Sequence, residues 1–350
     1  MKRVFLSFVA AMAAVFCSAP AVADPDAAAE TEADADGGSP SFSLPVECPA
    51  AGCLVQNYVD RDDGDGVLDF QCGGAAYDGH KGVDFRLLSA AQADATDAPV
   101  LAAAPGRVVA VRDGERDRLA RTADDFAAVK GRECGNGVVV DHGGGWVTQY
   151  CHLKKGSLAV RRGDVVESGA RLGAIGYSGR AAFAHVHFEI RRKDAVVDPF
   201  MPARGGCDPS GAAADLWTQG ARTQIPAATG GPMTAALEAG FAPGPVSPDA
   251  LEDAGPPAAP ATPQAPALVF YARFMNTRGG DEIRLDVQGP DGPFAEATTG
   301  PLERNKATYV AYAGARRRDD PWARGRYEGR AVLVRGDHTV AEATAAIVID

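Results

Sequence analysis

The sequence predicts a mainly β protein, in which an antiparallel β-sheet domain is followed by a small β-sandwich of the immunoglobulin or fibronectin kind. Over residues 44–203, short β-branched runs such as "GNGVVVDH", "WVTQYCHL" and "HVHFEIRR" alternate with glycine turns. This alternation is typical of antiparallel strands and not of βαβ units. Over residues 266–350, further runs such as "ALVFYARFM" and "GRYEGRAVLVRGD" indicate the strands of the sandwich.

Residues 1–23 are predicted to form a secretory signal peptide. They combine a short basic start, an apolar run and a small-x-small cleavage site that ends at Ala23. A membrane span needs about 20 apolar residues in a row, and Pro20 and Asp24 interrupt the run too early for that. We therefore expect an exported chain, in the periplasm or outside the cell, with no membrane insertion after the signal is removed.

Residues 24–43 are predicted to be a disordered acidic leader. The stretch "DPDAAAETEADADGG" carries six acids and no base, and it is too polar and too rich in alanine to bury a core. The whole chain has a net charge of −11. This acidic balance argues against binding to nucleic acid or to an anionic membrane surface.

Residues 204–265 are predicted to be an irregular extension that continues into a Pro/Ala-rich linker. In the sandwich that follows, at residues 266–350, Ile283, Leu285 and Val287 alternate with charged neighbours, as in a strand with one buried face. The sandwich shows no catalytic cluster in its sequence. We expect an accessory or spacer module, and the alternative is a module that docks a protein partner.

The cysteines indicate disulfide bonds. The chain has seven, and removal of the signal would leave six, an even number that is typical of exported proteins. Cys134 and Cys151 flank a predicted hairpin, so we expect these two to be bonded to each other. The partners of the other four stay open. A metal role for the cysteines is disfavoured because none forms a close C-x-x-C pair.

Five of the six histidines lie between His80 and His187 inclusive, which indicates a shared site. In "AHVHFEI", His185 and His187 are two residues apart on a predicted strand, so their side chains project from one face. In "GHKGVDF", His80 precedes Asp84 by four residues in a glycine-flexed stretch, so both side chains can reach one cation. With His187 they form a set of two histidines and one carboxylate that leaves a fourth position open, as in catalytic zinc sites.

The segments "HKGVD", "YCHL" and "HVHFE", in this order, resemble the lysostaphin/LytM-like family of zinc metallopeptidases, which cut peptidoglycan cross-links. The segments "GNGVVVDHGGGWVTQYCHL" and "GDVVESGARLGAIGYSGRAAFAHVHFEI" also resemble the core of that family. The resemblance covers roughly residues 72–200. It implies that the antiparallel β-sheet domain at residues 44–203 is a zinc metallopeptidase domain.

The same resemblance implies a role for each of five residues. His80, Asp84 and His187 would bind Zn²⁺. His152 and His185 would be catalytic histidines that do not bind the metal, and which of them is the general base stays open. These roles agree with the chemistry of the residues, because zinc acidifies water and polarises a carbonyl, and a histidine can carry the proton to the leaving amine.

The sequence therefore predicts an exported zinc-dependent endopeptidase that hydrolyses amide bonds in peptidoglycan cross-link peptides, in cell-wall remodelling or lysis. Its binding partner would be the peptide stems. The resemblance leaves two bonds open, a D-alanyl to diaminopimelate linkage and a glycine-containing bridge, and the alanine- and arginine-rich composition favours the first. Two other functions are also considered: a catalytically silent wall-binding or regulatory protein that retains a zinc site, and a metal carrier or secreted peptidase that acts on proteins.

Three more residues near the motifs are considered. Tyr150, two residues before His152, either orients substrate or packs in the core. Asn136 either donates to a substrate carbonyl or belongs to a turn. His142 is expected at the surface or behind the site.

Overall fold

The computed structural model describes residues 39–48, 53–203, 205–210, 215–231 and 233–350. The predicted signal peptide at residues 1–23 and most of the predicted leader at residues 24–43 lie outside the described residues. Phe42, near the end of that leader, is described and is fully buried, and its backbone forms a bridge with Trp217. The predicted leader therefore extends too far, because burial of an aromatic side chain ties Phe42 to the folded domain.

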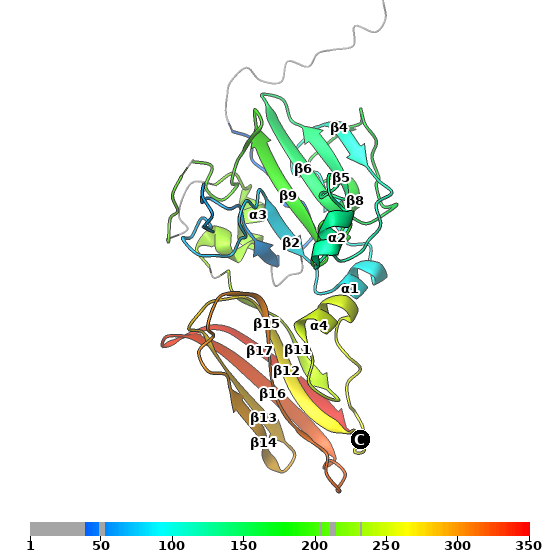
Figure 1. The fold of residues 1–350 in the computed structure, drawn as a ribbon, viewed down its shortest axis with the longest axis vertical. Coiled ribbons are helices and arrows are strands. Elements are labelled where there is room, and N and C mark those ends of the chain that lie inside the picture. The colour runs from blue at the N-terminus through cyan, green and yellow to red at the C-terminus, as the bar shows by residue number, and fades with distance from the viewer. Residues whose placement is uncertain (1–38, 49–52, 204, 211–214, 232) are drawn as a thin grey trace, which may run out of the picture. The chain divides into compact units, whose positions relative to one another are not determined.

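An antiparallel sheet of eight strands within the described residues carries most of the sequence motifs (Figure 1). Its strands lie in the order β1-β2-β9-β6-β5-β4-β7, and β10 pairs with β9 off this path. The strands are β1 (Val55–Asn57), β2 (Val83–Arg86), β4 (Gly106–Arg112), β5 (Asn136–Asp141), β6 (Trp146–Leu153), β7 (Val165–Val166), β9 (His185–Arg192) and β10 (Ala195–Val196). A separate antiparallel pair consists of β3 (Pro99–Leu101) and β8 (Arg171–Ala174).

Strand β9 shows why this sheet positions the histidines. Its alternate residues Val186, Phe188 and Ile190 are buried in the core. Tyr150 of the neighbouring strand β6 packs against Phe188, with ring centroids 5.3 Å apart. Because successive side chains of a strand point to opposite faces, this packing directs the two histidines of β9 to the other face.

Two short helices lie between strands of this part of the chain, one between β2 and β3 and the other between β4 and β5. They are α1 (Ala90–Ala95) and α2 (Ala123–Ala128). The Ser89 hydroxyl caps the start of α1, and Thr122 and Asp125 form a capping box at the start of α2. Both caps satisfy backbone N–H groups that a helix start leaves without partners.

Three disulfides are present among the described residues. Cys134–Cys151 confirms the pair that the hairpin predicted. Cys48–Cys53 and Cys72–Cys207 are pairings that the sequence left open. The Cys72–Cys207 bond joins residues 135 positions apart, so spacing alone does not identify it.

Seven strands form two antiparallel sheets that we call the C-terminal sandwich (Figure 1). One sheet has the order β11-β12-β15 and the other β14-β13-β16-β17. The strands are β11 (Ala235–Ala242), β12 (Ala267–Thr277), β13 (Glu282–Gly289), β14 (Gly292–Thr298), β15 (Lys306–Arg316), β16 (Gly325–Arg335) and β17 (His338–Ile349). Buried side chains of both sheets, among them Phe270, Leu285 and Leu333, share one core. The predicted mainly β fold is therefore confirmed.

The segment at residues 204–265 differs from the predicted irregular extension and linker, because it contains regular structure. It holds α3 (Gln219–Gln224), the 3₁₀ helix η1 (Pro226–Thr229), β11 and α4 (Pro248–Ala254). The sequence "AALEAGFA" of β11 lacks the β-branched residues that mark a strand, and it becomes one because it pairs along its length with β12. Across the described residues, none of the helices has the length and apolarity needed to cross a membrane.

Candidate active site

Three neighbouring strands, β2, β9 and β6, bring together the predicted site residues, which are His80, Asp84, His152, His185 and His187. Asp84 of β2 pairs with His187 of β9. Cys151 of β6 pairs with the same His187, and His152 follows it in the chain. His80 comes from the loop before β2. The pairing of adjacent strands therefore gathers at one place on the sheet side chains that are far apart in the sequence.

Three of these residues direct a donor atom to one point. His80 Nε2 lies 3.1 Å from both Asp84 Oδ1 and His187 Nδ1, and His187 Nδ1 lies 2.9 Å from Asp84 Oδ1. The other ring nitrogen of His80, Nδ1, lies 2.6 Å from the carbonyl oxygen of Tyr58. Because a carbonyl only accepts, Nδ1 carries the proton and Nε2 faces the cluster with a lone pair.

This donor set fits a zinc ion. Donors at about 2.0–2.1 Å from a tetrahedral zinc are roughly 3.3 Å from one another, and three of them leave one position open. The observed separations of 2.9 to 3.1 Å are close to that value. Two imidazole nitrogens and a carboxylate oxygen are also ligands that zinc accepts.

Neighbouring groups that are not themselves metal donors orient Asp84 and His187. Asn57 Nδ2 donates to Asp84 Oδ2 at 2.8 Å. Glu189 Oε2 lies 3.7 Å from His187 Nε2. Gly82 allows the loop to pass close to β9, because a Cβ at this position would lie only 2.8 Å from the His187 ring. Such contacts orient the ligands of a metal site.

Charges within the cluster set the protonation of two donors. Burial alone would raise the pKa of the Asp84 carboxyl, but the charges of His80 and His185 lower it, and hydrogen bonds from His187 and His80 hold it well below its usual value. Burial would lower the pKa of His187, but hydrogen bonds to Asp84 and Glu189 raise it to about 9. In the metal-free protein, a proton on His187 supplies the positive charge that the carboxylates favour.

His152 and His185 lie beside these donors, with their ring centroids 4.6 Å apart. Nδ1 of each ring donates to a backbone carbonyl oxygen at 2.8 Å, that of Ser178 for His152 and that of Phe183 for His185. In the neutral ring the proton therefore sits on Nδ1, and Nε2 keeps a lone pair. His185 Nε2 lies 3.6 Å from Asp84 Oδ1, so this lone pair is at the edge of the donor cluster.

Burial keeps both of these rings neutral. Burial lowers the pKa of His152 well below its usual value, and His185 and His187 lower it further because protonated imidazoles repel one another. Burial lowers the pKa of His185 to about 4, although the charge of Asp84 opposes the shift. At neutral pH both rings are therefore uncharged, and each Nε2 keeps its lone pair.

The backbone at His152 is in an uncommon conformation. Its φ is 65°, in the left-handed region that non-glycine residues seldom occupy. Such a conformation costs roughly 1–3 kcal/mol and persists where the surroundings hold it. The His152 N–H donates to the carbonyl of Cys134 at 2.8 Å, and Cys134 is bonded to Cys151, the residue just before His152. The disulfide and this hydrogen bond thus hold the histidine in place.

The structure resolves the alternatives for Tyr150 and Asn136 in favour of structural roles. Tyr150 is fully buried, and its hydroxyl accepts from the N–H of Ala103 at 2.8 Å. Asn136 is also fully buried, and its amide donates to the carbonyls of Glu115 and Leu153. Neither amide nor hydroxyl is therefore directed to the five-residue site.

His142 also lies apart from the site residues, as expected. Its Nδ1 lies 2.6 Å from the carbonyl oxygen of Pro105, and its Nε2 lies 2.8 Å from the hydroxyl of Thr148. Sequence reasoning missed Asn57, which is 27 positions from Asp84. No motif links these two residues, and only the pairing of β1 with β2 brings them together.

Part of the chain is similar to known proteins. Residues 78–199 match the family model described as Peptidase family M23. The chain is 29% identical over 119 residues to "Peptidoglycan DD-endopeptidase ShyB" of Vibrio cholerae serotype O1, which covers 34% of this chain and 22% of that protein. It is 36% identical over 84 residues to "Cell division protein DipM" of Caulobacter vibrioides, which covers 23% of this chain and 14% of that protein.

A zinc-containing peptidase from Vibrio cholerae is among the similar solved structures, with 23% identity and a TM-score of 0.32, over 46% of this chain and 39% of that chain. The present chain spans less than a quarter of the length of the curated relatives named above. The residues that match the family model, 78–199, include all five site residues.

Proposed function

Because this chain carries a domain of peptidase family M23 at residues 78–199, we propose that it is an exported, zinc-dependent endopeptidase. It would hydrolyse amide bonds in the peptide cross-links of bacterial peptidoglycan. The observation that carries this proposal is the arrangement of three convergent metal donors beside two neutral histidines. The relative named "Peptidoglycan DD-endopeptidase ShyB" supports the substrate class. On the same ground we propose that the bond cut is the D-alanyl to diaminopimelate bond.

His80, Asp84 and His187 would hold the zinc ion through Nε2, Oδ1 and Nδ1. When bound there, zinc would supply a Lewis acid that polarises the scissile carbonyl and acidifies the attacking water. The hydrogen bonds from His80 to Tyr58 and from Asn57 to Asp84 would keep these donors in one orientation.

His152 and His185 would move the proton. Each has an unprotonated Nε2, the two rings lie side by side, and burial keeps each ring neutral. One ring takes the proton of the attacking water at Nε2. The protonated ring then has an N–H at Nε2, which can donate to the developing oxyanion and return the proton to the leaving amine. The geometry is compatible with either histidine in this role.

We also propose the organisation of the chain around this site. Residues 44–203 would form the catalytic domain, and residues 266–350 together with β11 an accessory sandwich that can dock a protein partner. The three disulfides support export, because such bonds persist in oxidising compartments. The proposed secretory signal at residues 1–23 would direct that export.

Incubation of purified sacculi with the zinc-loaded chain, followed by mass spectrometry of the soluble products, tests the proposed function. We expect monomeric muropeptides to replace cross-linked dimers, with new ends that identify the D-alanyl to diaminopimelate bond. A chain with one bound zinc that sediments with sacculi and releases no fragment would refute the enzyme and indicate a wall-binding protein. Faster cleavage of casein than of sacculi would refute the substrate class.

A further inference from the structure

Next to the Asp84–His187 pair, the β2–β9 ladder contains a second pair with a buried polar side chain. Arg86 of β2 lies opposite His185 of β9. Because side chains two residues apart on a strand share a face, Arg86 lies on the same face as Asp84, beside the site. Arg86 is only 5% exposed. A buried guanidinium therefore adjoins the proposed catalytic histidine.

Phe183 lies between Arg86 and His185. Its ring stacks on the His185 ring, with centroids 4.2 Å apart and planes at 24°. Arg86 Cζ lies 5.0 Å from the centroid of the same Phe183 ring. The Phe183 carbonyl is also the acceptor for His185 Nδ1–H. The position of Phe183 thus determines both the ring plane and the tautomer of His185.

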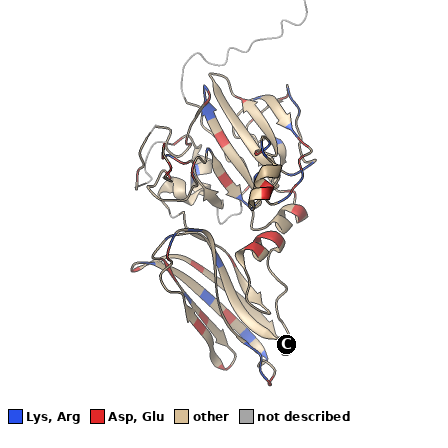
Figure 2. Ribbon diagram, viewed as in Figure 1, with Lys and Arg blue, Asp and Glu red and all other residues tan. Residues whose placement is uncertain are grey.

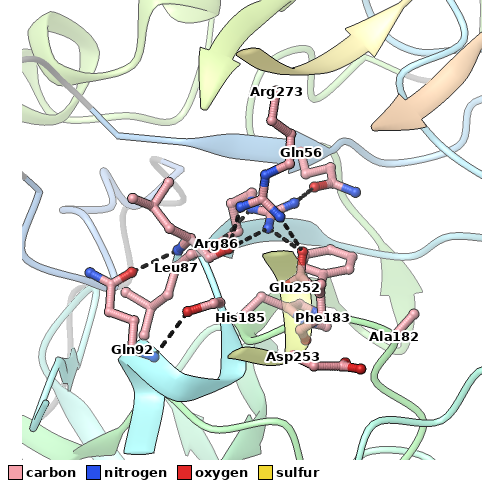
Figure 3. Close-up of polar contacts among 12 residues, drawn as sticks. Gln56, Arg86, Leu87, Gln92, Ala182, Phe183, His185, Glu252, Asp253 and Arg273 are labelled. Atoms are coloured by element: carbon pink, nitrogen blue, oxygen red, sulfur yellow. Dashed lines mark hydrogen bonds and ion pairs between the residues drawn. The ribbon is translucent and has the colours of Figure 1, made fainter. Parts of the chain in front are cut away.

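Arg86 in turn is held by a residue of the C-terminal part of the chain (Figure 3). Its Nη2 donates to Glu252 Oε2 of helix α4 at 2.6 Å, and its Nη1 donates to Gln56. Arg273 Nη1 of β12 donates to the same Glu252 oxygen at 3.3 Å. Arg273 Nε lies 2.9 Å from Glu238 Oε1 of β11 without hydrogen-bond geometry, so this contact is electrostatic. Two buried guanidiniums are therefore neutralised by two buried carboxylates.

Helix α4 makes a second contact, which reaches Ala182, the residue before Phe183. Asp253 Oδ1 lies 2.8 Å from Arg121 Nη1, and Arg121 Nε donates to the carbonyl of Ala182 at 3.1 Å. Figure 2 shows the acidic residues gathered on this helix. The helix therefore contacts Ala182 and Phe183 through two separate arginines, Arg121 and Arg86.

The charge balance makes the contact through Glu252 the stronger of the two. An ion buried without its partner is strongly disfavoured in a protein interior, and both Arg86 and Glu252 are buried. Without Glu252, the buried guanidinium of Arg86 would keep only neutral acceptors, which are Gln56 and the carbonyls of Leu87 and Leu88, and would lose its hydrogen-bonded counter-charge beside the Phe183 ring. Helix α4, from the C-terminal part of the chain, thus completes the surroundings of His185 in the eight-stranded sheet.

We propose that Glu252, Arg86 and Phe183 are positioning residues for His185, so that helix α4 and the C-terminal sandwich belong to the working catalytic unit. This inference rests on the proposed function, since it assigns a catalytic role to His185. None of the three residues has to touch the substrate. Their effect would be exerted through the orientation and the hydrogen bond of the His185 ring.

The test compares three variants of the full chain. Glu252→Gln removes the charge that holds Arg86, and Phe183→Leu removes the stacked ring while it leaves the ion network intact. Asp249→Asn is the matched control, because Asp249 lies on the same helix α4 but is exposed. Each variant is assayed for kcat and KM on a purified cross-linked muropeptide dimer. ¹⁵N NMR of the histidine rings reports the proton on His185 Nδ1, and only six histidines contribute signals.

We expect Glu252→Gln and Phe183→Leu to lower kcat by roughly ten- to hundredfold, the size of effect that misplaced catalytic groups produce, with KM unchanged. The His185 Nδ1–H signal should shift toward that of a mobile imidazole, which a merely stabilising contact would not cause. Asp249→Asn should match the parent in every readout. If Glu252→Gln does not fold, Phe183→Leu decides alone.

A folded Glu252→Gln or Phe183→Leu chain with the parent's kcat and the parent's His185 signal would overturn the positioning role. The NMR measurement separates this outcome from failure of the proposed function. If the parent cuts no peptidoglycan bond, the endopeptidase assignment fails. The shift of the His185 signal then still supports the positioning contact, and an unchanged signal overturns it.

Discussion

The Asp84–His187 pair and the Arg86–His185 pair are neighbours on one ladder, but their buried charges are balanced in different ways. At the first pair, His80, Asp84 and His187 turn donor atoms toward one another at 2.9 to 3.1 Å. At the second pair, Arg86 meets the carboxylate of Glu252, which comes from another part of the chain. The first cluster has room for a cation, whereas the second already contains its counter-charge.

This difference shows how one sheet face can hold both a reactive centre and its support. A cluster of convergent donors with an open position can bind a metal ion that enters it. A cluster of paired ions gives a fixed geometry instead, because each charge has a protein partner. The contrast predicts that changes at the first pair act on metal and chemistry, and that changes at the second act on stability and alignment.

Replacement of His187 with alanine should have the largest effect. The variant loses one of three zinc donors, so we expect both metal retention and peptidoglycan hydrolysis to be abolished. Metal analysis after gel filtration and the sacculus assay measure the two losses. His338→Ala is the control, because His338 is exposed in the C-terminal sandwich. Full activity of the His187→Ala chain would contradict the assignment of the site.

Replacement of His152 or His185 with alanine should separate chemistry from metal binding. A general acid–base group contributes about 10²–10⁴-fold to rate, so we expect kcat to fall by that order while zinc stays bound. Parallel measurements of bound zinc and of kcat on a muropeptide dimer check this. Loss of zinc comparable to that in His187→Ala would show that the two rings are not separate from the metal donors.

Glu252 and Asp253, which are adjacent on α4, provide a test of stability at the second pair. Glu252→Gln leaves buried arginines without their shared carboxylate, and breaking a buried pair in this way costs about 3–5 kcal/mol. Asp253→Asn removes an exposed pair with Arg121, where the Asp253 side chain is 54% exposed, and such pairs contribute about 0–1 kcal/mol. Urea unfolding of both variants measures the difference. Equal free energies of unfolding would contradict the account.

Zinc affinity should depend on pH through His187. Its pKa in the metal-free chain is raised to about 9, so at neutral pH the ring is protonated, and zinc must displace that proton. The apparent affinity should therefore rise about tenfold per pH unit below that pKa and then level off. Calorimetric titrations in buffers of different ionisation enthalpy measure the released proton. An affinity that does not change across neutral pH would show that His187 is already neutral.

The contrast between the two pairs also explains what the sequence could predict. The spacings His80–Asp84 and His185–His187 are local, and the strand period of two places both histidines on one face. The Cys134–Cys151 disulfide follows from a hairpin in the same way. Such features can be predicted from residues close together in the sequence and from the regular geometry of strands.

The rest depends on contacts between distant segments. Arg86 and Glu252 are separated by 166 positions, and neither lies in a recognisable motif. Strand β11 forms without β-branched residues because β12 supplies its hydrogen bonds. Tertiary pairing therefore overrides local propensity in this segment, and the support of His185 follows from that pairing.

The most direct test of the central claim, that the cluster at the Asp84–His187 pair is left open for zinc, is anomalous diffraction at the zinc edge from crystals of the zinc-loaded chain. The account predicts one peak at roughly 2.0–2.2 Å from His80 Nε2, Asp84 Oδ1 and His187 Nδ1, with the Arg86–Glu252 contact intact beside it. A peak at other residues, or none in a chain that carries one equivalent of zinc, would contradict it.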